Sequence, residues 1–147
     1  MSVKTFGEIT PAWLTDILTQ HGSLLAGQVL HVDQTRDPNP ITQNATLHLT
    51  YTSDARGACP HRLFFKQNPN AAEARFYQQI APTLTNTAVP ICYDAQFDDA
   101  NSHVLVAYVE QTHFAPPEAL PMPLVYSEMI VDALADLHSQ FLSLIHI

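Results

Sequence analysis

The sequence predicts an α+β fold in which three helices accompany one five-stranded antiparallel sheet. Three observations predict this fold. Apolar residues recur with helical spacing in three segments, and with a period of two in the segments between them. The connections between the first three strands are short, which favours antiparallel pairing. The elements follow in the order helix, three strands, helix, two strands, proline-rich loop and helix, which is typical of the α+β class.

The first helix is expected between Thr10 and Gly22. Thr10 is suited to the cap of a helix, and the proline that follows it is suited to the first helical position. Leu14, Ile17 and Leu18 recur at helical spacing, and Gly22 supplies a stop. A short amphipathic helix is therefore expected near the start of the chain.

Three strands are expected next. Val29 to Val32 marks the first, and Arg62 to Lys66 the third. Between them, residues 45–52 alternate apolar Leu47 and Leu49 with polar neighbours. This alternation is typical of a strand with one buried face.

A second helix is expected from Ala71 to about Ile80. Asn70 is expected to cap it, and Glu73, three residues later, to complete a capping box. Two further strands, at 89–97 and 103–110, are expected to be joined by an acidic turn. After a loop with four prolines, a final helix is expected to present one apolar face, formed by Tyr126, Ile130, Leu134, Leu137 and Phe141.

Composition and charge exclude several classes of function. The chain has 147 residues, 46% of them apolar, and a formal charge of −8, which fits one domain and opposes binding to nucleic acid. No apolar run approaches the roughly 20 residues of a membrane-spanning helix, and the start of the chain lacks an apolar leader, so we expect a cytoplasmic protein without a membrane partner. Two isolated cysteines and eight scattered histidines form no CxxC or HExxH pattern, so no metal site is expected.

Lys66 and Glu73 are the first candidates for a chemical role. Lys66 ends an apolar strand, and Glu73 begins the next helix, where it shares a face with Phe76, Tyr77 and Ile80. If this face packs on the sheet, Glu73 is drawn inward and needs a partner, and Lys66 is the nearest candidate cation in the sequence. The alternative is that Glu73 only caps its helix and Lys66 is a solvated strand end.

Four short motifs occur in an order that resembles a known family. They are Phe64-Phe65-Lys66, Glu73-Ala74-Arg75-Phe76-Tyr77, Val89-Pro90-Ile91-Cys92-Tyr93 and Ala133-Leu134-Ala135-Asp136-Leu137-His138. With them, residues 8 to 141 resemble the N-terminal part of the kinase-like small-molecule phosphotransferases, which include the aminoglycoside phosphotransferases and choline kinases. The closest resemblance is to the ecdysteroid kinase-like branch. It implies a kinase-like nucleotide-binding N-terminal lobe with its hinge at 1–123, and a linker helix at 124–147 that leads to a C-terminal lobe.

The resemblance also implies a nucleotide site for ATP. Lys66 would contact the α- and β-phosphates, and Glu73 would orient it. Ala107, Tyr108 and Val109 would form the hinge, whose backbone binds adenine, although family members often carry Glu-Asp where Ala107 and Tyr108 stand. A loop of short polar residues would cover the phosphates without the glycines of a phosphate-binding motif, namely Thr42, Gln43 and Asn44.

The catalytic and metal-binding aspartates of the family would follow the final helix, and the sequence stops at Ile147 before either. We therefore expect the ATP-binding lobe of a phosphotransferase that acts on a hydroxyl of a small molecule, truncated before the catalytic loop and inactive alone, with Mg²⁺ bound only in a full-length parent. Two alternatives remain open. One is a non-catalytic α+β binding or interaction module, and the other is a pseudokinase-like regulatory fragment.

Overall fold

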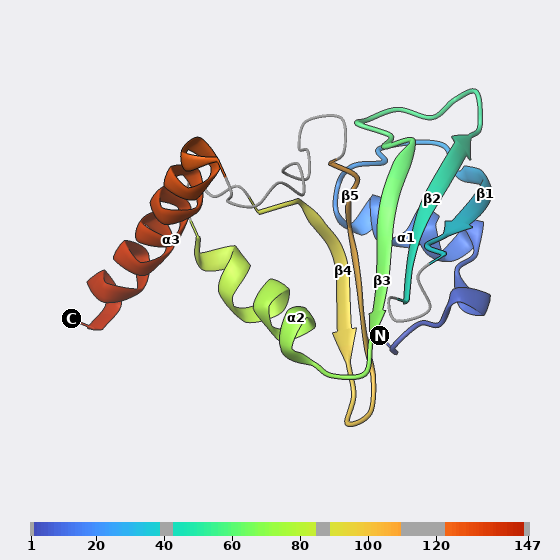
Figure 1. Ribbon diagram of the computed structural model, residues 1–147. Coiled ribbons are helices and arrows are strands. Elements are labelled where there is room, and N and C mark those ends of the chain that lie inside the picture. Colours follow the sequence, from blue (N-terminus) through green and yellow to red (C-terminus); the bar gives the residue numbers. More distant parts are fainter. Residues whose placement is uncertain (1, 39–42, 85–88, 110–122, 146–147) are drawn as a thin grey trace.

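The predicted α+β class and the five-stranded antiparallel sheet are confirmed by the computed structural model, which describes residues 2–38, 43–84, 89–109 and 123–145, with side chains up to residue 139 in the last range. The strands lie side by side in the order β1-β2-β3-β5-β4, and each neighbouring pair is antiparallel (Figure 1). Their bounds are β1 Val29–Arg36, β2 Gln43–Tyr51, β3 Arg62–Asn68, β4 Cys92–Phe97 and β5 Ser102–Ala107.

The first helix forms where it was expected. A 3-10 turn, Phe6–Glu8, precedes α1, Pro11–Gln20. The Thr10 hydroxyl oxygen accepts a hydrogen bond of 3.2 Å from the Trp13 amide, so the predicted cap is confirmed. The apolar side of α1, formed by Leu14, Ile17 and Leu18, is buried against the sheet.

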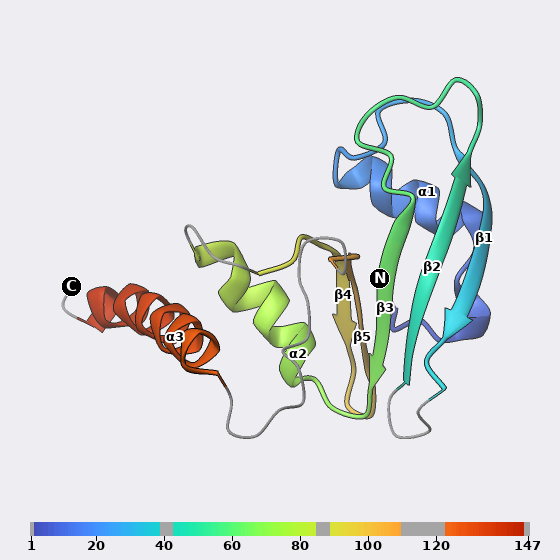
Figure 2. The same cartoon turned by 45° about the horizontal axis from the view of Figure 1, so that its top comes forward.

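A different helix covers each face of the sheet. On one face, α1 packs on a core that includes Leu47, Leu63, Phe65 and Leu105. On the other face, α2 (Ala72–Arg75) buries Ala74 in a second cluster, with Ala95, Val104 and Val106. Figure 2 shows α1 and α2 on opposite sides of the sheet. Successive residues of a strand point to opposite faces, so β3 contributes Phe65 to the first core and Phe64 to the second.

A buried pair of polar side chains holds the N-terminal segment against the sheet. The backbone amide of Lys4 donates a hydrogen bond of 2.9 Å to His103 Nδ1, and His103 Nε2 lies 2.9 Å from Asp94 Oδ2. A backbone amide can only donate, so Nδ1 is the acceptor and the ring proton is on Nε2, which donates to the carboxylate. The ring of His103 stacks on Phe65 at a centroid distance of 5.4 Å and meets Trp13 edge-on.

The second helix differs from the prediction at both ends. It begins at Ala72 with Ala71 as N-cap, and no side chain caps it. Asn70 Oδ1 accepts from the Ala72 amide at 3.1 Å, one position before the cap, and Glu73 does not fold back, so the predicted capping box is wrong. Beyond Arg75 the helical path continues as π-helical turns at Phe76–Ile80 and a 3-10 turn at Ala81–Thr83, where a proline is tolerated because the first turn of a helix needs no N–H donor.

The last two strands are shorter than predicted, and the final helix lies apart from the sheet. β4 begins at Cys92, three residues later than expected, and β5 ends at Ala107, while residue 110 lies outside the described ranges. The final helix, α3 (Leu124–Ile145), forms as expected and lies beyond α2, away from the sheet (Figures 1 and 2). Several of its apolar residues are exposed, Leu124 by 72% and Ile130 and Leu134 each by 48%, while Tyr126 and Leu137 are partly buried. Within the described ranges, no helix is both long and apolar enough to span a lipid bilayer.

Candidate functional site

Lys66 and Glu73 form an ion pair. Lys66 Nζ lies 2.7 Å from Glu73 Oε2, and each side chain is 34% exposed. Asn68 Nδ2 donates a hydrogen bond of 2.9 Å to the same carboxylate oxygen. The predicted pairing of Lys66 with Glu73 is therefore confirmed, and Asn68 fixes the carboxylate from a second side.

The local sequence explains why these groups meet. Phe65 is fully buried under α1, so the residues before and after it in β3 point to the other face of the sheet, where α2 lies. Arg62, Phe64 and Lys66 alternate along β3 and therefore share that face. The strand ends at Asn68 and α2 begins at Ala72, so a short connection brings Glu73 back over the end of the strand.

A cavity of about 290 Å³ lies next to this pair. The sheet contributes Phe64 and Val106 to its lining, and the α2 side contributes Glu73 and Tyr77. Pro90 and the segment that follows β5 complete it, with the residues Ala107, Tyr108 and Val109. The cavity therefore connects the carboxylate that holds Lys66 with the three residues predicted as the hinge, between mostly apolar walls.

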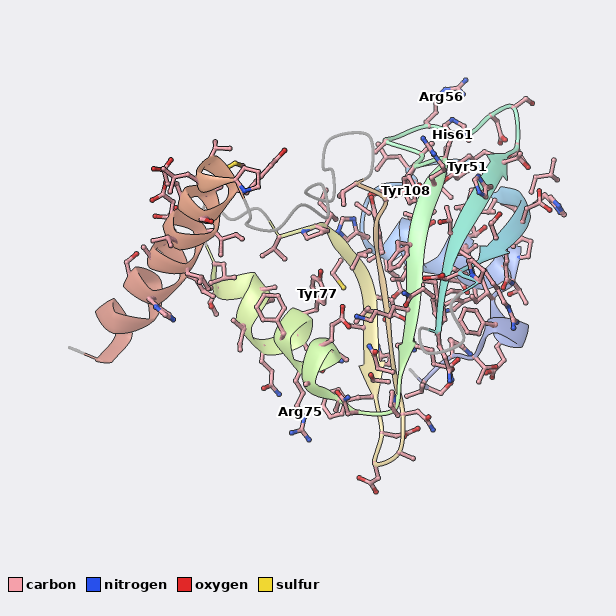
Figure 3. The ribbon with its side chains drawn as sticks, viewed as in Figure 1. Tyr51, Arg56, His61, Arg75, Tyr77 and Tyr108 are labelled. Atoms are coloured by element: carbon pink, nitrogen blue, oxygen red, sulfur yellow. The ribbon has the colours of Figure 1, made fainter. Side chains whose placement is uncertain are left out.

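The end of the cavity at β5 has a fixed geometry. The guanidinium carbon of Arg62 lies 4.6 Å from the centre of the Tyr108 ring, a cation–π arrangement that holds the ring in place. Figure 3 shows Tyr108 at the end of the sheet away from the β4–β5 turn. The Ala107 amide donates to the Ile91 carbonyl at 2.8 Å. This amide is therefore already engaged and cannot donate to a ligand. The predicted hinge thus loses the Ala107 N–H as a donor for a base.

The residues predicted to cover phosphates are only partly in place. Thr42 lies outside the described ranges. Gln43 and Asn44 begin strand β2 instead of forming a loop, because they pair with Gln67 and Lys66 of the neighbouring strand β3. Asn44 stands directly opposite Lys66, on the face that carries the ion pair, and its buried Oδ1 has no hydrogen-bond partner among the described residues. Gln43 alternates to the other face and is exposed.

Burial keeps Tyr77 in the cavity wall and the nearby Cys92 neutral at pH 7. Burial raises the pKa of the Tyr77 hydroxyl to about 12, with smaller contributions from Cys92 and Glu73. Burial also raises the pKa of the Cys92 thiol to about 12. A thiol that stays protonated at pH 7 is a poor nucleophile, so the described chemistry of the site rests on the Lys66 ammonium and not on Cys92.

Metal ligation has little support in the described ranges. They contain no group of three or more histidine, cysteine, aspartate or glutamate side chains that could hold a metal ion. The carboxylate beside Lys66 is that of Glu73, and its Oε2 is already engaged by both Lys66 and Asn68. Binding and positioning of an anion is the chemistry that this arrangement supports.

Sequence reasoning missed three contributors to the site. The sequence pattern gives Asn68 no role, places Tyr77 on the apolar face of a helix, and places Arg62 at the start of a strand without a role in the site. The alternation of Arg62, Phe64 and Lys66 was a usable signal, since residues two apart in a strand share a face. The contacts of Asn68 and Tyr77 depend on the path of α2, which the sequence pattern does not define.

The chain was compared with protein-family models, with curated proteins and with solved structures, and none of the three comparisons gave a match.

Proposed function

We propose that the chain binds ATP in the cavity beside the Lys66–Glu73 pair, as the nucleotide-binding lobe of a phosphotransferase that acts on a hydroxyl group of a small molecule. The observation that carries the proposal is the lining of the cavity, which runs from Glu73 to the residues 107–109 after β5. One end thus offers a site for charge and the other a site for a base.

The charged end has the chemistry that phosphates require. An ammonium on a strand, held by a carboxylate on the following helix, positions the phosphates of ATP in protein kinases. Lys66 has this place on β3, and Glu73 on α2 is 2.7 Å away. Both side chains keep one-third of their surface exposed, so a phosphate can reach the ammonium without dismantling the pair.

The apolar end has the chemistry that a base requires. Phe64, Val106 and Tyr108 offer apolar and aromatic surface for a planar ring. A volume of about 290 Å³ is near the lower limit of ligand cavities, so it holds the base while the phosphates extend towards Lys66. Phosphoryl transfer further needs a base for the hydroxyl and metal ligands. We therefore restrict the proposal for the described part of the chain to nucleotide binding, and assign the transfer to the parent enzyme implied by the resemblance.

Titration of ATP into the intact chain and into Lys66→Ala, by calorimetry, tests the proposal. A hydrogen bond from a charged group contributes about 1.5–3 kcal/mol, so Lys66→Ala should weaken binding by roughly 10- to 150-fold. The chain has only one other lysine, Lys4, whose backbone amide donates to His103 on the α1 face of the sheet, and Lys4→Ala is the matched control that should bind like the unmodified chain. Equal affinity of ATP for Lys66→Ala and for the unmodified chain would contradict the proposal. The absence of ATP binding to the unmodified chain would also contradict it.

A further inference from the structure

Tyr77 stands between two cavities. The cavity described above and a second cavity of about 270 Å³ share two lining residues, Tyr77 and Pro90. The second cavity is otherwise bounded by His21 at the end of α1, by Ala81 and Pro82 after α2, and by the segment that leads into β4. Figure 3 shows the Tyr77 side chain between α2 and β4.

The packing of Tyr77 explains how the ring keeps this position. It packs against the apolar cluster of Ala74, Val104 and Val106, and the ring of Phe76 meets it edge-on at a centroid distance of 5.3 Å. Tyr77 is partly buried, and its hydroxyl makes no hydrogen bond to another described residue. The ring is therefore held by apolar contacts, and its polar end is left for a ligand.

We propose that Tyr77 limits the depth of the nucleotide cavity and so determines which bases the site accepts. This inference rests on the proposed function for its ligand and adds the residue that sets specificity. With Tyr77 in place, the cavity ends at the ring and takes an unsubstituted purine. A base that carries a bulky apolar group on its inner edge is excluded by overlap with the ring. Because both cavities touch Tyr77, its truncation would join them and nearly double the space.

The test compares two ligands on four proteins. ATP and N6-benzyl-ATP are titrated into the intact chain, Tyr77→Leu, Tyr77→Ala and Phe76→Ala. Tyr77→Leu removes the far part of the ring and retains most of the buried apolar contact, so it guards against loss of folding in Tyr77→Ala. Phe76→Ala is the matched control, since this neighbouring aromatic residue packs on Tyr77 but lines neither cavity. Circular dichroism confirms that each variant is folded.

The intact chain and Phe76→Ala should prefer ATP over N6-benzyl-ATP by at least tenfold. Tyr77→Leu and Tyr77→Ala should bind N6-benzyl-ATP at least tenfold more tightly than the intact chain does. If the folded Tyr77 variants keep the preference of the intact chain for ATP, the inference is wrong while the proposed function stands.

A nucleotide-free measurement separates the inference from the proposed function. Apolar cavities opened by truncation bind small aromatic molecules. Indole should raise the melting temperature of Tyr77→Ala or Tyr77→Leu by more than it raises that of the intact chain or Phe76→Ala. If no variant binds ATP, the proposed function fails, and indole decides whether Tyr77 separates two cavities. An indole effect in both Tyr77 variants that is no larger than in the intact chain would overturn that role.

Discussion

Replacement of Asp94 by asparagine should destabilise the fold through the loss of one buried hydrogen bond. The Asp94 side chain is 6% exposed and that of its partner His103 is not exposed at all. The carboxylate accepts from His103 Nε2 through Oδ2 and from Gln96 Nε2 through Oδ1, both at 2.9 Å. An asparagine can offer an oxygen to only one of these donors and turns its amide group towards the other.

The expected cost follows from this geometry. A hydrogen bond to a charged group contributes about 1.5–3 kcal/mol, so Asp94→Asn should lower the free energy of unfolding by that amount. For a chain of this size it corresponds to a fall in melting temperature of roughly 3–12 °C. Thermal unfolding followed by circular dichroism at pH 7 measures it.

The pH dependence gives a second readout. Burial raises the pKa of Asp94, and the hydrogen bonds from His103 and Gln96 outweigh it and hold the pKa below its ordinary value. A carboxyl whose pKa is lower in the folded state stabilises the fold above its unfolded pKa of about 3.9. That stabilisation is lost as the pH falls from there through the folded pKa. The difference in stability between the parent chain and Asp94→Asn should therefore be constant near neutral pH and shrink below about pH 4.

The chain contains its own matched control. His31 Nε2 and Asp33 Oδ1 on β1 lie 3.0 Å apart, but their side chains are 62% and 72% exposed. Exposed ion pairs contribute about 0–1 kcal/mol, so Asp33→Asn should change the melting temperature little. Equal effects of Asp94→Asn and Asp33→Asn would refute the reasoning, because burial is the only difference on which it depends.

Three further predictions concern the core, the ion pair and α3. Phe65→Ala should cost about 3–5 kcal/mol in urea-induced unfolding, since Phe65 is fully buried and its ring contacts Phe6 and Trp13; a cost under 1 kcal/mol would contradict this packing. Glu73→Gln should lower the free energy of unfolding by less than about 1 kcal/mol, since the pair that it breaks is one-third exposed; a loss of several kcal/mol would make the pair structural. Ile130→Lys combined with Leu134→Lys should reduce fluorescence of the dye ANS and leave the melting temperature of the sheet unchanged, because both side chains are exposed; a lower melting temperature would place α3 in the core.

The periodicity of apolar residues correctly predicted the elements that bury one face and expose the other. Leu14, Ile17 and Leu18 on α1, and Leu47 and Leu49 on β2, are buried as their spacing indicates. In these segments each residue's environment depends on its own element packing against one neighbour. The local pattern therefore contains enough information to define it.

Asp94 shows where such a pattern fails. Simple alternation places Asp94 on the same face as Cys92, two residues earlier. The pairing with β5 shifts register between these residues, so that Cys92 faces Val106 while Asp94 faces Leu105 on the opposite side of the sheet. One extra residue in a strand inverts every side chain after it, and no feature of the sequence marks this position.

The candidate site was predictable to a similar extent. The pairing of Lys66 with Glu73 followed from the helical spacing of Glu73 and from the short distance in sequence to Lys66, both of which are local. The capping box at Asn70 was wrong because a distant contact fixes this connection: the Ser102 hydroxyl donates to the Asn70 carbonyl at 2.5 Å. The position of Tyr77 between the two cavities was not predictable, since it depends on how α2, β4 and the end of α1 pack together.

The most direct test of the nucleotide site is chemical labelling with an acyl-phosphate derivative of ATP, which transfers its acyl group to an amine held beside the phosphates. Lys66 and Lys4 are the two lysines of the chain, so mass spectrometry of the peptides reads the outcome without ambiguity. We expect labelling of Lys66 that excess ATP suppresses, and labelling of Lys4 that ATP does not affect. Equal labelling of both lysines, or labelling of Lys66 that persists in excess ATP, would contradict the account.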